Sequence, residues 1–144
     1  MTLETSSRPN ASCETSCEDA SMEADSSSER TILIVEDHPS FVAAARFLLE
    51  MDGFVVVGVA TDGASAVRET LRVSPEIVLL DISLPDMDGF EVASRLRAAG
   101  ASTRIVFTSS RDWSDYGSQI ADSGGLGFIA KAELSGEGLR ALLA

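Results

Sequence analysis

Charged and hydroxyl side chains follow four of the apolar runs in this sequence. Glu36 and Asp37 come after the first run, Asp81 after the third, Thr108 after the fourth and Lys131 after the fifth. If these runs are parallel strands, their carboxyl ends meet at one edge of a sheet, where open α/β sheets bind ligands. A charged residue after a strand is usually a solvated loop residue. Together, however, these residues would place three carboxylates, a hydroxyl and an ammonium around one crevice.

Three carboxylates in a small volume repel one another, and a hard divalent cation with oxygen ligands relieves that repulsion. We therefore expect Mg²⁺ as the cofactor. A phosphoryl group held between the cation, the Thr108 hydroxyl and the Lys131 ammonium would leave Asp81 as an oxygen nucleophile in line with the phosphorus. Lys131 is the only lysine, whereas the ten other basic residues are arginines. A compact ammonium on a flexible stem suits a mobile phosphoryl group.

The elements that must position these residues are visible in the hydrophobic pattern. Short apolar runs alternate with amphipathic stretches, which is typical of βα repeats around a parallel sheet. We predict an α/β fold with five strands and five helices. The strands are expected at residues 31–35, 54–60, 77–80, 104–108 and 127–130, and the helices at about 39–52, 62–73, 89–100, 112–123 and 134–143.

The apolar spacing also predicts which face of each helix contacts the sheet. The fourth helix is the weakest, because Gly117 interrupts it and its apolar stripe is thin. The predicted inner faces of the first three helices are Phe41, Ala44, Ala45 and Leu48, then Ala64, Val67 and Leu71, then Phe90, Ala93 and Leu96.

The first 30 residues differ in composition from the rest of the chain. They contain eight Ser, three Thr and seven acidic residues, and Leu3 is their only branched aliphatic residue. Such a segment cannot bury enough apolar surface to offset its ordering entropy. We predict a disordered acidic, Ser-rich tail at residues 1–30 and one domain at residues 31–144. Cys13 and Cys17 lie in the tail, where no further Cys or nearby His could complete a metal site.

The charge and hydropathy of the chain limit its partners. A formal net charge of -12 argues against a surface that neutralises nucleic-acid phosphates or anionic lipid. No apolar run approaches the roughly 18 residues of a membrane span, and no signal-peptide core follows Met1. We therefore expect a cytoplasmic protein whose partners are proteins or cations, with no direct nucleic-acid or membrane contact.

Four stretches of the chain resemble the motifs of response-regulator receiver domains, in the order in which that family has them. The resemblance covers about residues 31–143. It implies a flavodoxin-like, doubly wound (βα)5 sandwich around a central five-stranded parallel sheet, and a single-domain receiver in a two-component phosphorelay. The stretches are residues 32–39 (ILIVEDHP), 77–89 (IVLLDISLPDMDG), 106–109 (VFTS) and 127–131 (GFIAK).

The resemblance also implies a phosphorylation site and a metal site. Asp81 matches the phosphoacceptor, which receives its phosphoryl group from the phosphohistidine of a histidine kinase or phosphotransfer protein, or from a small phosphodonor. Glu36, Asp37 and Asp81 match the acidic Mg²⁺ site, with the backbone carbonyl of Ser83 as a further ligand.

A signalling switch is implied as well. Thr108 matches the hydroxyl that moves toward the phosphoryl group, Phe128 matches the aromatic switch residue, and Lys131 matches the lysine of the motif. We expect the signal to reach the surface formed by the fourth strand, the fourth helix and the fifth strand. The sequence leaves open whether phosphorylation drives homodimerisation there, and it does not name the downstream protein target.

The chain departs from the family pattern after its lysine. Proline often follows the lysine in the family, whereas Ala132 follows Lys131, which makes this chain more similar to receivers attached to helix-turn-helix DNA-binding domains. Only 13 residues follow Lys131, enough for the last helix. We therefore expect either a receiver that acts through protein contacts or the receiver part of a truncated DNA-binding response regulator.

Three alternatives stay open at this point. An aspartyl-nucleophile phosphohydrolase would also use Asp81 and Mg²⁺, but such enzymes place a second Asp two residues later, where this chain has Ser83, so we expect no enzyme. A phosphorylation-independent scaffold is the second alternative. For the single histidine, His38, we expect a loop position near the acidic pocket, with partner contact or pH sensing as the other interpretation.

Overall fold

The computed structural model describes residues 30–111 and 116–143. The predicted tail up to residue 29, with Cys13 and Cys17, and the predicted start of the fourth helix at residue 112 lie outside the described residues. The central feature is a five-stranded parallel sheet, as predicted, and its strand order is β3-β2-β4-β5-β6. Its strands are β2 (Arg30–Val35), β3 (Phe54–Ala60), β4 (Ile77–Asp81), β5 (Arg104–Ser109) and β6 (Gly127–Ala130).

A helix follows each strand, and none of the described helices is long and apolar enough to cross a membrane. Gly117 stands at the start of the fourth helix with a φ of 32° rather than inside it. The fifth helix is shorter than predicted, because a 3₁₀ turn at Lys131–Glu133 precedes it. The helices are α2 (Pro39–Met51), α3 (Gly63–Val73), α4 (Gly89–Ala98), α5 (Gly117–Asp122) and α6 (Gly136–Leu143).

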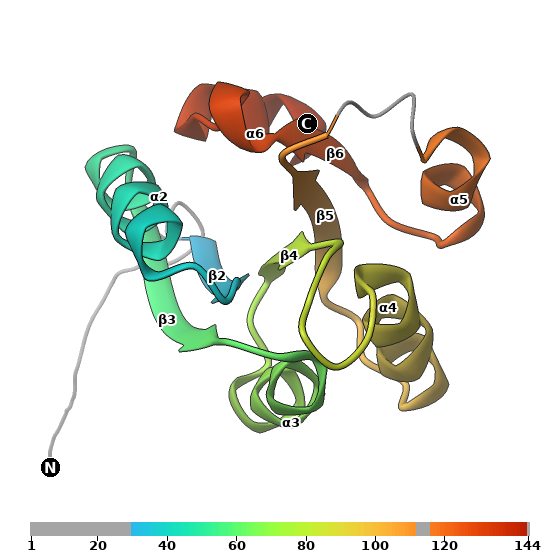
Figure 1. The fold of residues 1–144 in the computed structure, drawn as a ribbon. Coiled ribbons are helices and arrows are strands. Elements are labelled where there is room, and N and C mark those ends of the chain that lie inside the picture. The colour runs from blue at the N-terminus through green and yellow to red at the C-terminus, as the bar shows by residue number, and fades with distance from the viewer. Residues whose placement is uncertain (1–29, 112–115, 144) are drawn as a thin grey trace, which may run out of the picture. The chain divides into compact units, whose positions relative to one another are not determined.

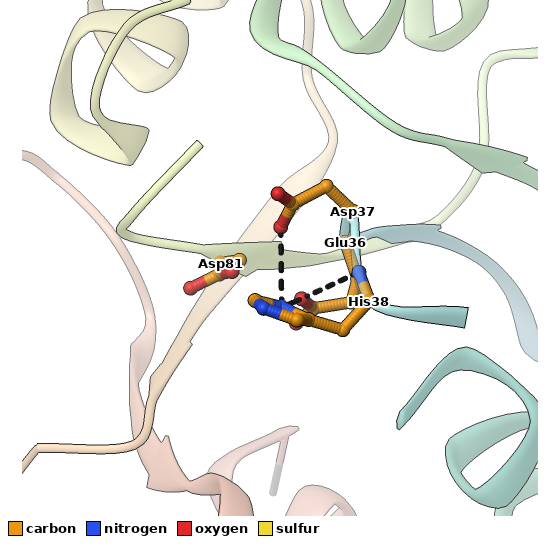
Figure 2. Close-up of side chains that lie close together, drawn as sticks. All are labelled: Glu36, Asp37, His38 and Asp81. Atoms are coloured by element: carbon orange, nitrogen blue, oxygen red, sulfur yellow. Dashed lines mark hydrogen bonds and ion pairs between the residues drawn. The ribbon is translucent and has the colours of Figure 1, made fainter. Parts of the chain in front are cut away.

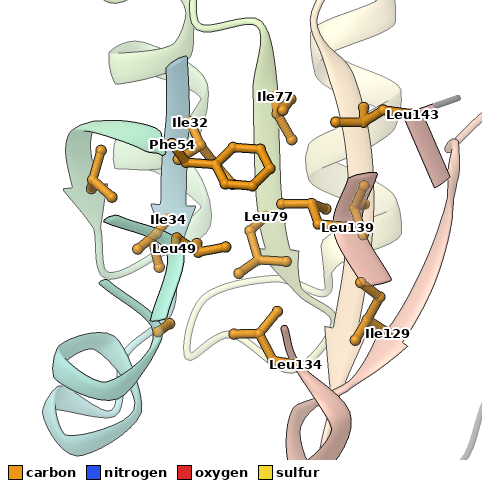
Figure 3. Packing of buried hydrophobic residues seen from close by; sticks show 13 residues of the cluster. Ile32, Ile34, Leu49, Phe54, Ile77, Leu79, Ile129, Leu134, Leu139 and Leu143 are labelled. Atoms are coloured by element: carbon orange, nitrogen blue, oxygen red, sulfur yellow. The ribbon is translucent and has the colours of Figure 1, made fainter. Parts of the chain in front are cut away.

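The sheet separates two layers of helices. Helices α2 and α6 cover one face, and α3, α4 and α5 cover the other (Figure 1). The core on the α2/α6 face is drawn in Figure 3, where Leu49, Leu139 and Leu143 from the helices meet Ile34 and Leu79 from the strands. Every residue of β4 is buried, because this strand lies in the middle of the sheet between both layers.

The predicted inner faces of the first two helices were partly wrong. In α2 the buried residues are Ala45 and Leu49, whereas Leu48 is 41% exposed. Helix α2 carries more apolar residues than one face can bury, so hydrophobicity alone does not fix its rotation about its axis. In α3 the buried residues are Gly63, Ala66 and Thr70, while Leu71 is 46% exposed.

The α3 face is explained by a close approach at its first residue. The Met87 side chain lies directly against Gly63, where any Cβ would collide with it. The face that contains Gly63 and the residues three and seven positions later, Ala66 and Thr70, must therefore point inward. The prediction for α4 was correct for Ala93 and Leu96, which are buried, whereas Phe90 is half-buried.

Candidate functional site

The polar residues singled out in the sequence lie at one edge of the sheet, just after its strands. The strand order reverses between β2 and β4, the point at which open α/β sheets bind ligands. Glu36 and Asp37 follow β2, and Asp81 ends β4 next to it. The register pairs Asp81 with Thr108 of β5, and Lys131 follows β6. The parallel sheet thus brings together residues that lie up to 95 positions apart.

Glu36 and Lys131 form an ion pair at the centre of this edge. The Glu36 side chain is fully buried, and its Oε1 lies 2.7 Å from Lys131 Nζ. Burial alone would raise the pKa of Glu36, but hydrogen bonds from Lys131 and His38 outweigh it and hold that pKa below its usual range. Burial likewise lowers the pKa of Lys131, but the carboxylates of Glu36 and Asp81 raise it above the usual range. Both groups are therefore charged near neutral pH.

Asp81 is the perturbed carboxyl of the cluster. Only 1% of the residue is exposed, and Lys131 Nζ lies 3.4 Å from its Oδ2. Burial, reinforced by the negative charge of Glu36, raises the pKa of Asp81 to about 6, against the opposing hydrogen bond from the Ser83 N–H and the charge of Lys131. One ammonium faces two buried carboxylates, so the cluster has excess negative charge whenever Asp81 is ionised.

Asp37 and His38 complete an acidic pocket at the same edge. Figure 2 shows the His38 ring between the carboxylates, with Nδ1 2.7 Å from Glu36 Oε2 and 3.3 Å from Asp37 Oδ1. One ligand atom from each of Glu36, Asp37, His38 and Asp81 lies within 4.8 Å of the others. These contacts raise the pKa of His38, first through the hydrogen bond to Glu36 and then through the charges of Asp37 and Glu36.

The donor set fits a divalent cation. Buried Glu36 and Asp81 provide hard oxygen ligands, and Asp37 adds a half-buried carboxylate with an Oδ1 that receives no hydrogen bond from the described residues. A cation there would offset the excess negative charge that Lys131 leaves uncompensated. Among the residues that the structure describes, this is the one group of His, Cys, Asp and Glu with that geometry.

Thr108 stands beside Asp81 with an unused hydroxyl. The residue is 1% exposed, and its Oγ1 is buried without a hydrogen-bond partner in residues 30–111 and 116–143. An unpaired buried hydroxyl is costly, and a ligand at this edge could supply the missing partner. A phosphoryl oxygen on Asp81 is a suitable acceptor, because the two residues are register partners.

The loop between β4 and α4 is held by contacts that the sequence analysis missed. The Ser83 N–H donates to Asp81 Oδ1 at 3.1 Å, and the side chain of Ser83 is exposed. Further along the loop, both oxygens of Asp86 accept hydrogen bonds from the first two amides of α3, Gly63 at 2.7 Å and Ala64 at 3.0 Å. These bonds and the N-terminus of α3 hold the pKa of Asp86 below its usual range. No sequence motif marks this contact, because it joins residues 22 and 23 positions apart.

The glycine at the end of the same loop is required by close packing. A Cβ on Gly89 would lie 2.7 Å from the backbone oxygen of Asp81, so only glycine lets α4 begin this near β4. Asp88 caps the helix by accepting a hydrogen bond from the Glu91 N–H at 2.8 Å. The residues after Asp81 therefore fix the start of α4 against β4, in addition to forming part of the motif.

Phe128 lies on the opposite face of the sheet from Thr108. The register pairs Phe128 with Phe107 and Thr108 with Ile129, and side chains alternate along each strand. The half-buried Phe128 ring is 6.2 Å from that of Tyr116, which the sequence analysis did not single out. The Tyr116 hydroxyl is 3.0 Å from Ser109 Oγ. Tyr116 thus connects the residue after Thr108 with the predicted aromatic switch.

Comparison with known proteins identifies the family. The sequence model of the response regulator receiver domain matches residues 32–143. A putative transcriptional regulator of Pseudomonas aeruginosa is 36% identical over 102 residues, 71% of this chain and 49% of the relative. The DNA-binding transcriptional activator EvgA of Escherichia coli K12 is 35% identical over 101 residues, 70% of this chain and 50% of the relative.

A solved structure gives the same result at the level of the fold. The signal receiver domain of the putative response regulator NarL from Mycobacterium tuberculosis superimposes with a TM-score of 0.72 at 29% identity, covering 81% of this chain and 98% of that one. The chain spans about half the length of the curated relatives it matches, and those relatives are named as transcription regulators rather than enzymes. Because these relatives are named as transcription regulators, they do not support our expectation that the chain makes no direct contact with nucleic acid. The chain belongs to the response regulator receiver domain family of two-component systems.

Proposed function

We propose that this receiver accepts a phosphoryl group on Asp81 from the phosphohistidine of a histidine kinase or phosphotransfer protein. The observation that carries the proposal is the buried Asp81 carboxyl, placed between Glu36, Lys131 and a Thr108 hydroxyl that has no hydrogen-bond partner among the described residues. A perturbed carboxyl of this kind, set among complementary charges at a ligand-binding edge, is typical of a reacting group. A structural ion pair would need neither the second buried carboxylate nor the free hydroxyl.

The proposed site binds Mg²⁺ through the carboxylates of Glu36, Asp37 and Asp81 and the backbone carbonyl of Ser83. When bound, the cation neutralises charge on the transferring phosphoryl group. An ionised Asp81 oxygen forms the new bond to phosphorus as the phosphorus–nitrogen bond of the donor breaks, and the donor imidazole leaves with the bonding electron pair. The Lys131 ammonium pairs with the phosphoryl oxygens, and the Thr108 hydroxyl donates a hydrogen bond to one of them.

The proposed consequence is a change at the α5 side of the domain. The Thr108 hydroxyl binds the phosphoryl group in only one of two arrangements, so phosphorylation shifts their populations. Phe128 is the proposed aromatic partner, and α5 with the neighbouring ends of β5 and β6 is the proposed surface for a downstream protein or a second receiver. This function is that of a signalling domain, and we propose no catalytic turnover of a substrate.

Mass spectrometry after incubation with acetyl phosphate and Mg²⁺ tests this proposal. We expect one added phosphoryl group, lost when a chelator removes the metal and lost in Asp81→Asn. Asp122→Asn, which changes an exposed carboxyl on α5, is the matched control and should be labelled like the parent chain. Labelling that persists in Asp81→Asn would refute the assignment, and absence of labelling in the parent chain would favour the phosphorylation-independent scaffold.

A second candidate concerns the protein rather than the site. The matched relatives are named as transcription regulators, and this chain covers about half of each. The chain is accordingly proposed to be either a stand-alone receiver or the receiver part of such a regulator. Because its net charge is -12, we expect the chain alone not to bind duplex DNA at physiological salt. Fluorescence anisotropy with labelled DNA measures this, and micromolar binding would contradict it.

We also propose that residues 1–29 are a disordered acidic tail and that the rest of the chain forms the folded unit, with Arg30 in β2 although the sequence placed it in the tail. The composition of the tail supports this division. Limited proteolysis should first cut within the tail and leave a fragment that is still phosphorylated on Asp81. A tail that resists protease in the intact chain would argue against the division.

A further inference from the structure

The single histidine of the chain stands among the candidate metal ligands. His38 Nδ1 lies 2.7 Å from Glu36 Oε2 and 3.3 Å from Asp37 Oδ1 (Figure 2). A ligand atom of His38 also lies within 4.8 Å of a carboxylate oxygen of Asp81. The ring faces these carboxylates although 67% of the side chain remains exposed. An exposed imidazole could point into solvent, so its position against the pocket needs a cause.

The backbone provides that cause. His38 is the N-cap of α2 in an extended conformation, which the following Pro39 favours. Its N–H donates to Glu36 Oε2 at 3.1 Å, and its carbonyl accepts from the Val42 N–H at 3.1 Å. The side chain makes no capping hydrogen bond to the helix. Histidine is a weak residue for an N-cap, and residues that break a local preference are expected at functional sites.

The spacing of the atoms matches neighbouring ligands around one cation. In an octahedral site with bonds of about 2.1 Å, adjacent ligand atoms are about 3.0 Å apart and opposite ones about 4.2 Å. The distances of 2.7 and 3.3 Å from Nδ1 to two carboxylate oxygens bracket the first value. Asp37 Oδ1 is buried and receives no hydrogen bond within the described part of the chain. A cation between these three atoms would replace the imidazole–carboxylate contacts with three bonds to itself.

We propose that His38 Nδ1 is a further ligand of this cation site and gives it a preference for divalent transition metals such as Co²⁺ and Ni²⁺ over Mg²⁺. The inference rests on the proposed function, because it takes Glu36, Asp37 and Asp81 as ligands. Imidazole suits Ni²⁺ and related cations, whereas Mg²⁺ prefers oxygen and gives up water reluctantly. A nitrogen ligand therefore raises the affinity for Ni²⁺ relative to the affinity for Mg²⁺, rather than raising both affinities equally.

Electron spin-echo spectroscopy of bound Mn²⁺ tests the ligand directly in the untagged full-length chain. Because the sequence contains one histidine, an imidazole nitrogen bound to manganese can come only from His38. We expect nitrogen modulation in the parent chain and none in His38→Gln. The parent spectrum requires no variant, so a folding defect in His38→Gln cannot decide the result. Glu50→Gln, which removes an exposed carboxylate paired with Arg46, is the control and should keep the modulation.

Calorimetric titrations with Ni²⁺ and with Mg²⁺, in mildly alkaline buffer, test the preference. His38→Gln should weaken Ni²⁺ binding by about tenfold or more and change Mg²⁺ binding by less than about threefold. Equal weakening of both cations, or Mn²⁺ that binds without nitrogen modulation, would overturn the role of His38 and leave the proposed function intact. If the parent chain binds no divalent cation, the proposed function itself fails. It also fails if Asp81→Asn binds the cation as tightly as the parent chain does.

Discussion

The two strands that carry Asp81 and Thr108 are neighbours in the sheet, but the described residues that follow them make different contacts. After β4, the Ile82 N–H donates to the Thr108 carbonyl at 3.0 Å, Asp86 binds two amides of α3, and the Gly89 N–H donates to the Ile82 carbonyl at 2.7 Å. These contacts tie one loop to a strand and two helices. They hold the backbone on which Asp81 and Ser83 stand.

After β5, the described residues are joined by hydroxyl contacts. Ser109 Oγ accepts from the Arg111 N–H at 3.1 Å and lies 3.0 Å from the Tyr116 hydroxyl. Thr108 Oγ1 has no partner within residues 30–111 and 116–143. Neutral hydroxyl bonds can be exchanged at small net cost. The described contacts after β4 thus include carboxylate and backbone hydrogen bonds, whereas those after β5 are side-chain hydroxyl contacts.

The largest effect on stability is expected from Asp81→Asn without metal. The raised pKa means that Asp81 contributes stability which is complete below its unfolded pKa of 3.8 and is lost as pH rises through about 6. At pH 7.5 the variant avoids this loss and should be more stable by on the order of 2–3 kcal/mol. Urea denaturation of the parent chain and the variant at pH 7.5 and below pH 4 measures the difference in the free energy of unfolding. An advantage that persists below pH 4 would show that the charge is not its cause.

The second prediction removes an anchor on the β4 side. Asp86→Ala frees the first two amides of α3 and should lower the melting temperature by about 4 °C. Because the depressed pKa of Asp86 makes its contribution disappear as pH falls through that pKa, parent and variant should converge in acid. Thermal scans from neutral to acidic pH test both points. A variant that melts with the parent at neutral pH would remove the proposed contrast between the two loops.

A smaller effect is expected from the matching change on the β5 side. Tyr116→Phe removes the contact to Ser109 Oγ but keeps the ring beside Phe128, and should cost about 1 kcal/mol or less. The basal rate of Asp81 phosphorylation should not change. Amide exchange in α5 should become faster before phosphorylation, because the hydroxyl contact that restrains Tyr116 is missing. Unchanged exchange would mean that Tyr116 does not restrain this side of the domain.

The smallest net effect on stability is expected from Thr108→Ala. Within the described residues the hydroxyl has no hydrogen bond to lose, and relief of its burial cost opposes the loss of the packed methyl group. Phosphorylation of Asp81 should persist, but the response of α5 should disappear. Amide exchange across Gly117–Asp122, with and without a beryllofluoride mimic of the phosphoryl group, is the measurement. If the variant and the parent chain show the same mimic-induced change, Thr108 does not transmit the signal.

Much of the fold could be predicted because the sequence pattern is local. The strands at residues 54–60 and 127–130 have the predicted limits, and the other three differ by one residue at one end. The clustering of Glu36, Asp37, Asp81, Thr108 and Lys131 followed from a general rule, because polar residues after parallel strands meet at one edge, whereas Ser83 and Phe128 were singled out only by the family resemblance. Helix rotation was less predictable, and Leu48 and Leu71 are exposed although both were predicted to face the sheet.

The sequence by itself determined the order of the elements and the chemical groups at the strand ends, since both depend on periodicity and residue type over short distances. Only the tertiary structure decided that Asp86 accepts hydrogen bonds from the first two amides of α3, that Tyr116 contacts Ser109, and that the His38 ring faces Glu36 and Asp37. The Asp86 contact joins segments that are distant in the chain, and the other two depend on side-chain directions. Such contacts are set by how helices and loops pack against the sheet, and no local pattern of residues encodes that packing.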